Sequence, residues 1–527
     1  MPKITIDDKE VEIEEGLNII QAATRVGVEI PHFCYHPELS VVAQCRQCLV
    51  EVEGVPKVLP ACNTFVRDGL VVKTNTEKAI KAREATVEFT LINHPLDCPI
   101  CDKGGECPLQ LTTFRHGPGY SRFDGPEEKK VRKKYYLSDR ILYDPNRCIM
   151  CTRCVRFTDE VTKTGELGTS GRGFRKRIVV FPGKELDNEL AGNVIDLCPV
   201  GALLNKDTLH EERVWYWKFT DSVCSLCSNG CNITVGVDPR KGKVSRIRPR
   251  INTEVNGHWI CDRGRYEFKD VQEYKRLRDP IYKNNDEYEI TDWDTALDFF
   301  YRNFSNLNMS DYKRTAFLLS PMLTNEELYL FSLLYNETGA DYLVSDYIEQ
   351  TGEKKLGLVS SDPYPNSMGV KSQNISTDID DIIEQLLDNK IDALFVADLD
   401  MFGLVGEDKK ERLAKALSSL SFLAVMDYRL TETARYADLI LPGVTSYEKE
   451  GSFTNDRGRV QRVNRAIDPP GNAISDWEIL NMLGSRFNEA TFGYENTERI
   501  FLDIAQDVPA FSGLSYDRIG MLGAKSH

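Results

Sequence analysis

The sequence has no cysteine after Cys261, so all 15 of its cysteines lie in the first half of the chain. It has no run of about 18 apolar residues, so we expect no segment that spans a bilayer. The start, Met1–Asp8, has neither the apolar stretch nor the small-residue cleavage site of a secretory signal. These absences predict a chain that stays in the cytoplasm and carries its cysteine chemistry in its first half.

Positive charge is scarce relative to negative charge, because 66 lysines and arginines stand against 81 aspartates and glutamates, a formal net charge of −15. This acidic excess argues against a nucleic-acid surface as the main function. Apolar residues make up 41% and charged residues 28%, which excludes collagen-like, disordered and membrane-spanning classes. The length of 527 residues predicts three to four domains, at roughly 150 residues per domain.

The cysteines are clustered, and clustered cysteines in a reducing cytosol indicate metal binding or redox chemistry, because disulfides are rare there. They fall into four sets, and no cysteine is left over. The sets are Cys34, Cys45, Cys48 and Cys62 (set 1); Cys98, Cys101 and Cys107 (set 2); Cys148, Cys151, Cys154 and Cys198 (set 3); and Cys224, Cys227, Cys231 and Cys261 (set 4).

Set 2 has three cysteines and so needs one ligand of another kind. His94 precedes Cys98 with three residues between them, in a chain that has only seven histidines. We therefore expect His94 to complete set 2. His32 and His36 flank Cys34, but set 1 already has four thiolates, so we expect both to be structural.

Set 3 has the spacing of a bacterial ferredoxin, because two residues separate successive members of its cysteine triplet and a distant Cys-Pro completes the set. A two-cluster ferredoxin has a fourth cysteine after the triplet, and this chain has Thr158 there. The partner run, counted back from Cys198, contains Asn188, Ala191 and Val194 where cysteines would stand. The pattern predicts a two-cluster ferredoxin fold reduced to one 4Fe-4S cluster.

Zinc is the alternative metal for every set, because C-x2-C pairs also serve zinc ribbons. Set 1 alone suits either tetrahedral zinc or a 2Fe-2S cluster, and set 4 alone does not decide between the metals. The triplet of set 3 with its remote Cys-Pro is far more typical of 4Fe-4S. Four iron–sulfur clusters are the simplest account, with about 14 iron atoms by cluster stoichiometry.

Periodicity predicts a small domain around set 1. Residues 3–16 alternate apolar and polar around Asp7-Asp8-Lys9, which indicates a hairpin, and residues 17–26 read as a helix that Gly27 stops.

A second helix is expected over residues 79–93, with Ile80, Val87 and Leu91 on one stripe. The mixed charge run 127–134 is expected to be a solvated linker.

The second half of the sequence predicts a different secondary structure. Short strands around residues 233–237 and 244–247 suggest a small antiparallel domain at set 4. Beyond residue 280, helices alternate with apolar strands, which indicates an α/β fold with a mainly parallel sheet. The expected strands are 316–320, 393–397 and 422–426, and residues 379–387 are an expected helix.

Two cysteine loops resemble those of the large, G-type iron–sulfur subunit of bacterial respiratory complex I, the proton-translocating NADH:quinone oxidoreductase. Asn93–Cys107 resembles the family's loop of one histidine and three cysteine ligands, and Cys148–Thr158 resembles its single 4Fe-4S site. The loss of the second ferredoxin cluster is also a family trait. Set 4 resembles an extra cluster that only some bacterial members have.

The second half is similar to molybdopterin oxidoreductases. Ala437–Pro442, Glu450–Asn455 and Gly458–Gln461 resemble segments that help to hold a pterin in catalytic members. However, no cysteine after set 4 is present to ligate molybdenum, and Asp262-Arg263 stand where active relatives usually have a lysine. We therefore expect a retained scaffold without a molybdenum cofactor.

The resemblance implies a multidomain α+β then α/β fold. Its parts would be an N-terminal 2Fe-2S β-grasp ferredoxin domain, 4Fe-4S ferredoxin-like domains, and a shortened molybdopterin-oxidoreductase-like α/β domain. The expected boundaries are 1–78 (2Fe-2S), 79–120 (the site of one histidine and three cysteines), 121–215 (one 4Fe-4S cluster), 216–272 (4Fe-4S of molybdopterin-oxidoreductase type) and 273–527 (the α/β scaffold).

The resemblance also implies an electron-transfer subunit of a multisubunit enzyme, with one 2Fe-2S cluster at set 1 and 4Fe-4S clusters at the other sets, the last of them structural. Electrons would come from a flavin-bearing NADH-oxidising partner and pass toward the quinone site. Other peripheral-arm iron–sulfur subunits and the membrane arm would be further partners, on the cytoplasmic face of the bacterial inner membrane. The chain has no G-x-G-x-x-G fingerprint after a strand, so we expect no direct NADH binding and no catalytic residue.

Two alternatives remain at this point. A soluble NAD-linked formate dehydrogenase subunit would share the cluster order, but it needs a molybdenum ligand and normally the second ferredoxin cluster. A subunit of a NAD-reducing hydrogenase usually ends before set 4, whereas this chain continues with a long α/β half.

Overall fold

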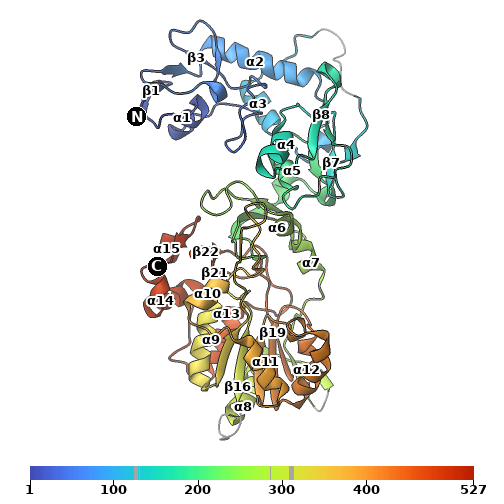
Figure 1. Ribbon diagram of the computed structural model, residues 1–527, viewed down its shortest axis with the longest axis vertical. Helices are drawn as coiled ribbons and strands as arrows, with labels where there is room; N and C mark the ends of the chain where they lie inside the picture. The colour runs from blue at the N-terminus through green and yellow to red at the C-terminus, as the bar shows by residue number, and fades with distance from the viewer. Residues whose placement is uncertain (124–128, 130, 285–286, 308–313, 527) are drawn as a thin grey trace. The chain divides into compact units, whose positions relative to one another are not determined.

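The computed structural model describes residues 1–123, 129, 131–284, 287–307 and 314–526. It divides into two compact units, unit 1 (residues 1–217) and unit 2 (residues 218–527), and each is described by itself below (Figure 1). Residues 127, 128 and 130 of the run 127–134, which was expected to be a linker, lie outside the described residues.

Unit 1 begins with the predicted hairpin. Strands β1 (Lys3–Ile6) and β2 (Lys9–Glu12) pair antiparallel through Asp7 and Asp8, whose φ angles are 45° and 68°. Two consecutive positive φ angles are typical of the turn that matches the twist of a two-residue hairpin. The alternation in the sequence therefore located both strands and their turn.

The hairpin belongs to a five-stranded sheet packed against one helix. Helix α1 (Ile19–Arg25) is capped by Asn18, whose side chain accepts a hydrogen bond from the Gln21 amide. Apolar side chains of the helix and sheet form one core. The remaining strands are β3 (Leu49–Val52), β4 (Leu59–Pro60) and β5 (Val71–Lys73), in the order β2-β1-β5-β3-β4.

Helix α2 (Glu77–Ile92) confirms the second predicted helix, but the predicted stripe is wrong at its first member. Ile80 is 40% exposed, whereas Ala79, Arg83 and Val87 are buried. The buried face includes an arginine because the Arg83 guanidinium donates a hydrogen bond to the Thr74 carbonyl oxygen and its charge interacts with Asp7. An apolar pattern cannot reveal such a residue.

The rest of unit 1 consists of short elements that carry sets 2 and 3. Helix α3 (Pro108–His116) follows set 2, and two small antiparallel sheets surround set 3. Their elements are β6 (Tyr135–Tyr136), β7 (Ile141–Tyr143), β8 (Leu167–Ser170), β9 (Arg177–Val180), β10 (Leu203–Asn205), α4 (Arg153–Arg156) and α5 (Asn193–Leu197).

Unit 2 begins with the small antiparallel domain that was predicted around set 4. Strands β11 (Lys218–Val223), β12 (Asn232–Asp238) and β13 (Lys243–Pro249) form its sheet, in that order. Two short helices follow, α6 (Asp262–Tyr266) and α7 (Phe268–Glu273).

A seven-stranded sheet organises the described part of unit 2. Its strands are β14 (Ile281–Asn284), β15 (Glu287–Ile290), β16 (Thr315–Leu319), β17 (Tyr342–Ser345), β18 (Ala393–Ala397), β19 (Phe422–Asp427) and β20 (Leu439–Pro442). The order is β15-β14-β20-β19-β18-β16-β17, and the last five strands run parallel. The three predicted strands and the predicted parallel sheet are confirmed.

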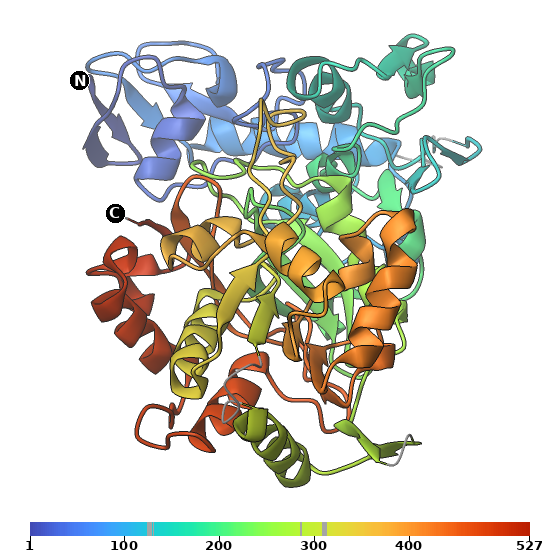
Figure 2. The same cartoon turned by 60° about the horizontal axis from the view of Figure 1, so that its bottom comes forward.

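Helices cover both faces of this sheet because its strands are apolar on both sides. Phe317 and Leu319 pack into one core, and Ala316 and Leu318 pack into the other. Figure 2 shows α9 (Asn325–Thr338, yellow) on one side and α12 (Glu407–Ser419, orange) on the other. The other helices are α8 (Trp293–Leu307), α10 (Ser367–Ser372), α11 (Ile379–Leu387, as predicted), α13 (Asp476–Ser485), α14 (Thr497–Asp507) and α15 (Tyr516–Ile519), and a last sheet contains β21 (Gly451–Thr454), β22 (Arg459–Val463) and β23 (Ala524–Lys525).

Candidate metal centres

Set 1 lies in the loop between α1 and β3 and in the turn after β4. Its side chains interact in two pairs, because Cys45 is the largest cause of the raised pKa of Cys34, and Cys62 is the largest cause of the raised pKa of Cys48. A 2Fe-2S cluster presents two irons with two thiolates each. The paired arrangement of set 1 therefore suits this cluster.

Set 2 surrounds one cavity. His94 follows the C-terminus of α2, and Cys107 is the residue before the first turn of α3. His94 and all three cysteines of set 2 line the same cavity of about 190 Å³. The structure thus brings together the four residues that the sequence predicted from spacing alone.

Gly201 closes the wall of this cavity at a position where a larger residue does not fit. A Cβ built on Gly201 would overlap the Cys101 sulfur and would lie 3.3 Å from the Lys103 Cβ. Gly201 belongs to the segment after Cys198, so the loop of set 3 packs directly onto a predicted ligand of set 2. No pattern in the sequence indicates this contact, because the two segments are about a hundred residues apart.

Set 3 also encloses a single cavity, which all four of its cysteines line. Met150 and Thr152, which flank Cys151, adopt left-handed φ angles of 56° and 57°. Burial raises the pKa of the Cys154 thiol, and neighbouring thiols add to the effect. Bound iron would supply the positive charge that buried thiolates require.

The positions that lack a second ferredoxin cluster are filled with packed side chains. Ala191 and Val194 are buried, and the Thr158 hydroxyl donates a hydrogen bond to the Val155 carbonyl oxygen. Asn188 Nδ2 donates to Glu166 Oε1 at 2.8 Å. The two polar side chains are hydrogen-bonded and the two apolar ones are buried, as expected for a site converted to ordinary core.

Set 4 lies in unit 2, with all four cysteines buried. Cys261 stands before α6, and its sulfur accepts a hydrogen bond from the Gly264 amide at 3.3 Å. Asn229 Nδ2 donates to the Cys231 sulfur at 3.1 Å. Burial raises the pKa of Cys231 well above its usual value, with the other three thiols as further causes.

In the described part of the chain, no group of three or more His, Cys, Asp or Glu side chains converges on a point where one metal ion could be held. A 4Fe-4S cluster differs from a single ion because each of its ligands binds a different iron.

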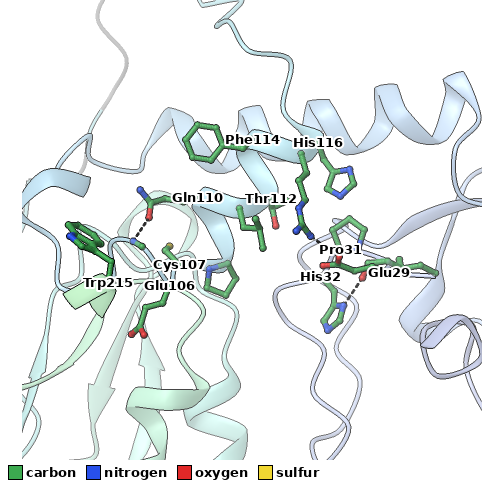
Figure 3. A pocket seen from close by; sticks show the side chains of 15 residues that line it. Glu29, Pro31, His32, Glu106, Cys107, Gln110, Thr112, Phe114, His116 and Trp215 are labelled. Carbon is green, nitrogen blue, oxygen red and sulfur yellow. Dashed lines mark hydrogen bonds and ion pairs between the residues drawn. The ribbon is translucent and has the colours of Figure 1, made fainter. Parts of the chain in front are cut away.

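Two further cavities lie in unit 1. Cys45, His94 and Cys148, one residue from each of sets 1, 2 and 3, line a cavity of about 400 Å³. Figure 3 shows the other, of about 680 Å³, between the segment before Cys34 and the loop of set 2. His32 lines it, and its Nδ1 lies 2.8 Å from the Ile30 carbonyl oxygen.

The site that would hold a pterin in unit 2 lies at the carboxyl ends of the parallel strands, where strand order reverses between β16 and β18. Asp398 and Asp427 follow or end strands there, and both interact electrostatically with Asp476. Lys449 forms ion pairs with Asp476 and Glu327. These four carboxylates outnumber Lys449 and Arg429, the two cations that interact with them, and an excess of buried negative charge does not fit the phosphates of a pterin cofactor.

Models of known families match the chain along most of its length. They describe a 2Fe-2S iron–sulfur cluster binding domain (residues 2–77), the NADH-ubiquinone oxidoreductase-G iron–sulfur binding region (83–122), the ferredoxin-like domain of NADH-quinone oxidoreductase subunit 3 (138–204), the molybdopterin oxidoreductase Fe4S4 domain (217–272) and molybdopterin oxidoreductase (276–382 and 373–486).

The NADH-ubiquinone oxidoreductase 75 kDa subunit of Reclinomonas americana is 30% identical over 653 residues, which cover 98% of this chain and 93% of the relative. The chain belongs to the family of the large iron–sulfur subunit of complex I. The 78 kDa mitochondrial subunit of Candida albicans is 29% identical over 96% of this chain and 85% of its own length. The 78 kDa mitochondrial subunit of Neurospora crassa is 43% identical over 67% of this chain and 47% of its own length.

Among solved structures, a chain of a NAD+-reducing [NiFe]-hydrogenase is 30% identical, with a TM-score of 0.37 over 40% of this chain and 91% of that chain. A TM-score of this size does not establish a shared arrangement of the chain.

Membership of this family confirms the resemblance that the loops of sets 2 and 3 carry. The fold class is confirmed as well, with 2Fe-2S and 4Fe-4S domains followed by a molybdopterin-oxidoreductase domain. The protein is an iron–sulfur electron-transfer subunit of the oxidoreductase complex I and acts together with other subunits. No helix in the described ranges is long and apolar enough to cross a membrane.

Proposed function

We propose that the chain holds one 2Fe-2S cluster at set 1 and a 4Fe-4S cluster at each of sets 2, 3 and 4, with His94 as the one ligand that is not cysteine. The two thiol pairs of set 1 and the cavities lined by all members of sets 2 and 3 support these assignments. Bound clusters supply one-electron redox chemistry. The residues of the chain fix the ligands, bury them from water and balance their charge.

Sets 1, 2 and 3 form the path of the electrons in this proposal. The observation that carries it is the cavity that Cys45, His94 and Cys148 line together, because it indicates that the three sites adjoin one another within unit 1. Electrons would arrive from a flavin-bearing subunit that oxidises NADH. They would leave toward other iron–sulfur subunits and the quinone site of a membrane arm, with this chain bound at the cytoplasmic face of the membrane.

Set 4 has a structural role in this proposal. It belongs to the molybdopterin-oxidoreductase part of the chain, and the buried carboxylates at the carboxyl ends of the parallel strands do not fit a pterin, so its electrons have no destination there. Metal binding supplies folding free energy, by analogy with structural zinc at roughly 10 kcal/mol or more.

We also propose the five-part division at residues 1–78, 79–120, 121–215, 216–272 and 273–527. It is supported by the ranges of the family matches, each of which falls within or close to one part.

The test compares Cys154→Ala with Cys227→Ala in the assembled complex. Cys154→Ala removes a ligand of set 3, so NADH-driven quinone reduction should be lost while the flavin still reduces an artificial acceptor. Cys227→Ala removes a ligand of set 4, so assembly should fall but each assembled complex should turn over at a near-normal rate per flavin. Normal quinone reduction without the cluster of set 3 would contradict the path. Equal losses of turnover in both variants would place set 4 on the electron path.

A further inference from the structure

A buried arginine joins the loops of sets 1 and 3. Arg156, the last residue of α4, is 6% exposed, and its Nη2 donates hydrogen bonds to the carbonyl oxygens of Cys34 at 2.6 Å and Cys151 at 3.2 Å. Its Nη1 donates to the Ser40 carbonyl oxygen at 2.5 Å. One planar guanidinium therefore contacts the backbone of a predicted ligand from each set.

Neighbouring contacts hold the same two loops together. Gln44 Nε2 donates a hydrogen bond to the Met150 carbonyl oxygen at 2.5 Å. Met150 has a left-handed φ angle and lies in the loop that carries set 3. Glu160 accepts hydrogen bonds from the amide and the hydroxyl of Ser40. Arg153 donates to the carbonyl oxygens of Tyr35 and Leu197. Arg156 lies at the centre of this interface because it donates hydrogen bonds to the backbone of a cysteine from each set, and the charge of the neighbouring Arg153 also interacts with Cys34 and Cys151.

The charge of Arg156 has no carboxylate partner in the described part of the chain, where its hydrogen bonds are to the three carbonyl oxygens. A charge inside a protein is costly unless an opposite charge is near. Four thiolates around an oxidised cluster core of about +2 leave a net charge of about −2, and one-electron reduction makes it more negative. Clusters at sets 1 and 3 would therefore supply the missing opposite charge.

We propose that Arg156 is a positioning residue that fixes the loop of set 1 against the loop of set 3 and eases the reduction of both centres through its charge. This inference rests on the proposed function. In the transfer between the two centres, one electron leaves the reduced 2Fe-2S centre and one electron arrives at the oxidised 4Fe-4S centre, and no proton or bond is exchanged. Arginine suits both tasks because it stays charged and its planar fork reaches several acceptors at once.

The test uses Arg156→Met and Arg156→Lys in the assembled complex, with redox titration followed by electron paramagnetic resonance. Arg156→Met removes the charge, so the midpoint potentials of both centres should move in the negative direction. Arg156→Lys keeps the charge but loses the fork, so both potentials should stay near those of the wild type. In rapid-freeze experiments after an NADH pulse, the centre of set 3 in the Arg156→Lys complex should be reduced several-fold more slowly than in the wild-type complex.

Arg83→Met is the matched control. Arg83 is a buried arginine of unit 1 that donates to a backbone carbonyl, and its charge faces Asp7 instead of a cysteine. Its loss should lower stability and leave both potentials unchanged.

Two results would overturn the proposal: an Arg156→Met complex in which either potential is unchanged, or an Arg156→Lys complex that reduces set 3 at the wild-type rate. If Arg156→Met does not assemble, the Arg156→Lys rate decides. Absence of either cluster signal in the wild type would instead contradict the proposed function, so the two failures are distinguishable.

Discussion

Lys449 and Asp476 form an ion pair inside unit 2, with 2.5 Å between Nζ and Oδ2, and a second carboxylate, Glu327, lies 3.1 Å from the same nitrogen. All three side chains are almost completely buried. The carboxylates raise the pKa of Lys449 above its usual value, although burial alone would lower it. The positive charge of one lysine therefore balances the carboxylates of Glu327 and Asp476, which lie in the first turns of α9 and α13.

Lys449→Met should lower the free energy of unfolding of unit 2 by about 3–5 kcal/mol, because it leaves buried carboxylates without a cation. Hydrogen–deuterium exchange in α9 and α13 measures the loss. Lys415→Met is the control, since Lys415 pairs with Glu411 at the surface and should leave exchange nearly unchanged. If exchange in α9 and α13 is the same in Lys449→Met as in the wild type, the carboxylates are protonated and need no cation.

Glu326 should make unit 2 less stable as pH rises. Burial raises its pKa from 4.5 to about 7, against hydrogen bonds from Ser452 and Tyr516 that lower it. Because the folded pKa is the higher one, the stabilisation is complete below pH 4.5 and is lost as pH rises through about 7, a change of about 3 kcal/mol.

Glu326→Gln should flatten this dependence, because the amide does not titrate. The rate of hydrogen–deuterium exchange of the α9 amides, corrected for the intrinsic effect of pH, measures this dependence. In the wild type the corrected rate should be lower below pH 5 than at pH 8, and in the variant the two rates should differ less. Equal pH dependence in the two chains would show that another group is responsible.

Gly201→Ala should remove the cluster of set 2 and spare the others. The new Cβ would overlap the Cys101 sulfur, so this predicted ligand would have to shift from its place in the cavity. Iron content should fall by about four atoms per chain, and the resonance signal of one 4Fe-4S centre should disappear. Gly403→Ala is the control, because nothing lies within 4 Å of its Cβ position. A full iron content in Gly201→Ala would contradict the assignment of the cavity.

His94→Cys should keep a 4Fe-4S cluster at set 2 but give it a more negative midpoint potential. A neutral imidazole gives the site a net charge of about −1, whereas a fourth thiolate gives about −2. Redox titration of the variant complex measures the shift. An unchanged potential, in a variant shown to ligate iron through the new sulfur, would refute the charge argument.

Much of this architecture is local and could be predicted from the sequence. The hairpin at Asp7 and Asp8, helix α2 and the strands of the parallel sheet follow from short-range periodicity and turn residues. The grouping of His94 with set 2 also follows from spacing, because three cysteines and one histidine within fourteen residues can reach a common centre.

What the sequence did not reveal depends on contacts between distant segments. Arg156 and Gly201 act across separations of about a hundred residues, and neither residue type signals its role. Ile80 was placed in the core because the pattern counted apolar residues, whereas the helix buries Arg83, which donates to the Thr74 carbonyl oxygen and interacts with the charge of Asp7. Lys449 was missed for the same reason, since buried charged networks have no periodicity.

The central claim is that this chain holds one 2Fe-2S and three 4Fe-4S clusters. Mössbauer spectroscopy of the 57Fe-labelled full chain, with a metal count on the same sample, tests it most directly. We expect about 14 iron atoms per chain, about one seventh of them with the signature of 2Fe-2S and the remainder with that of 4Fe-4S. Zinc in place of iron at any set, or iron without a 2Fe-2S component, would contradict the account.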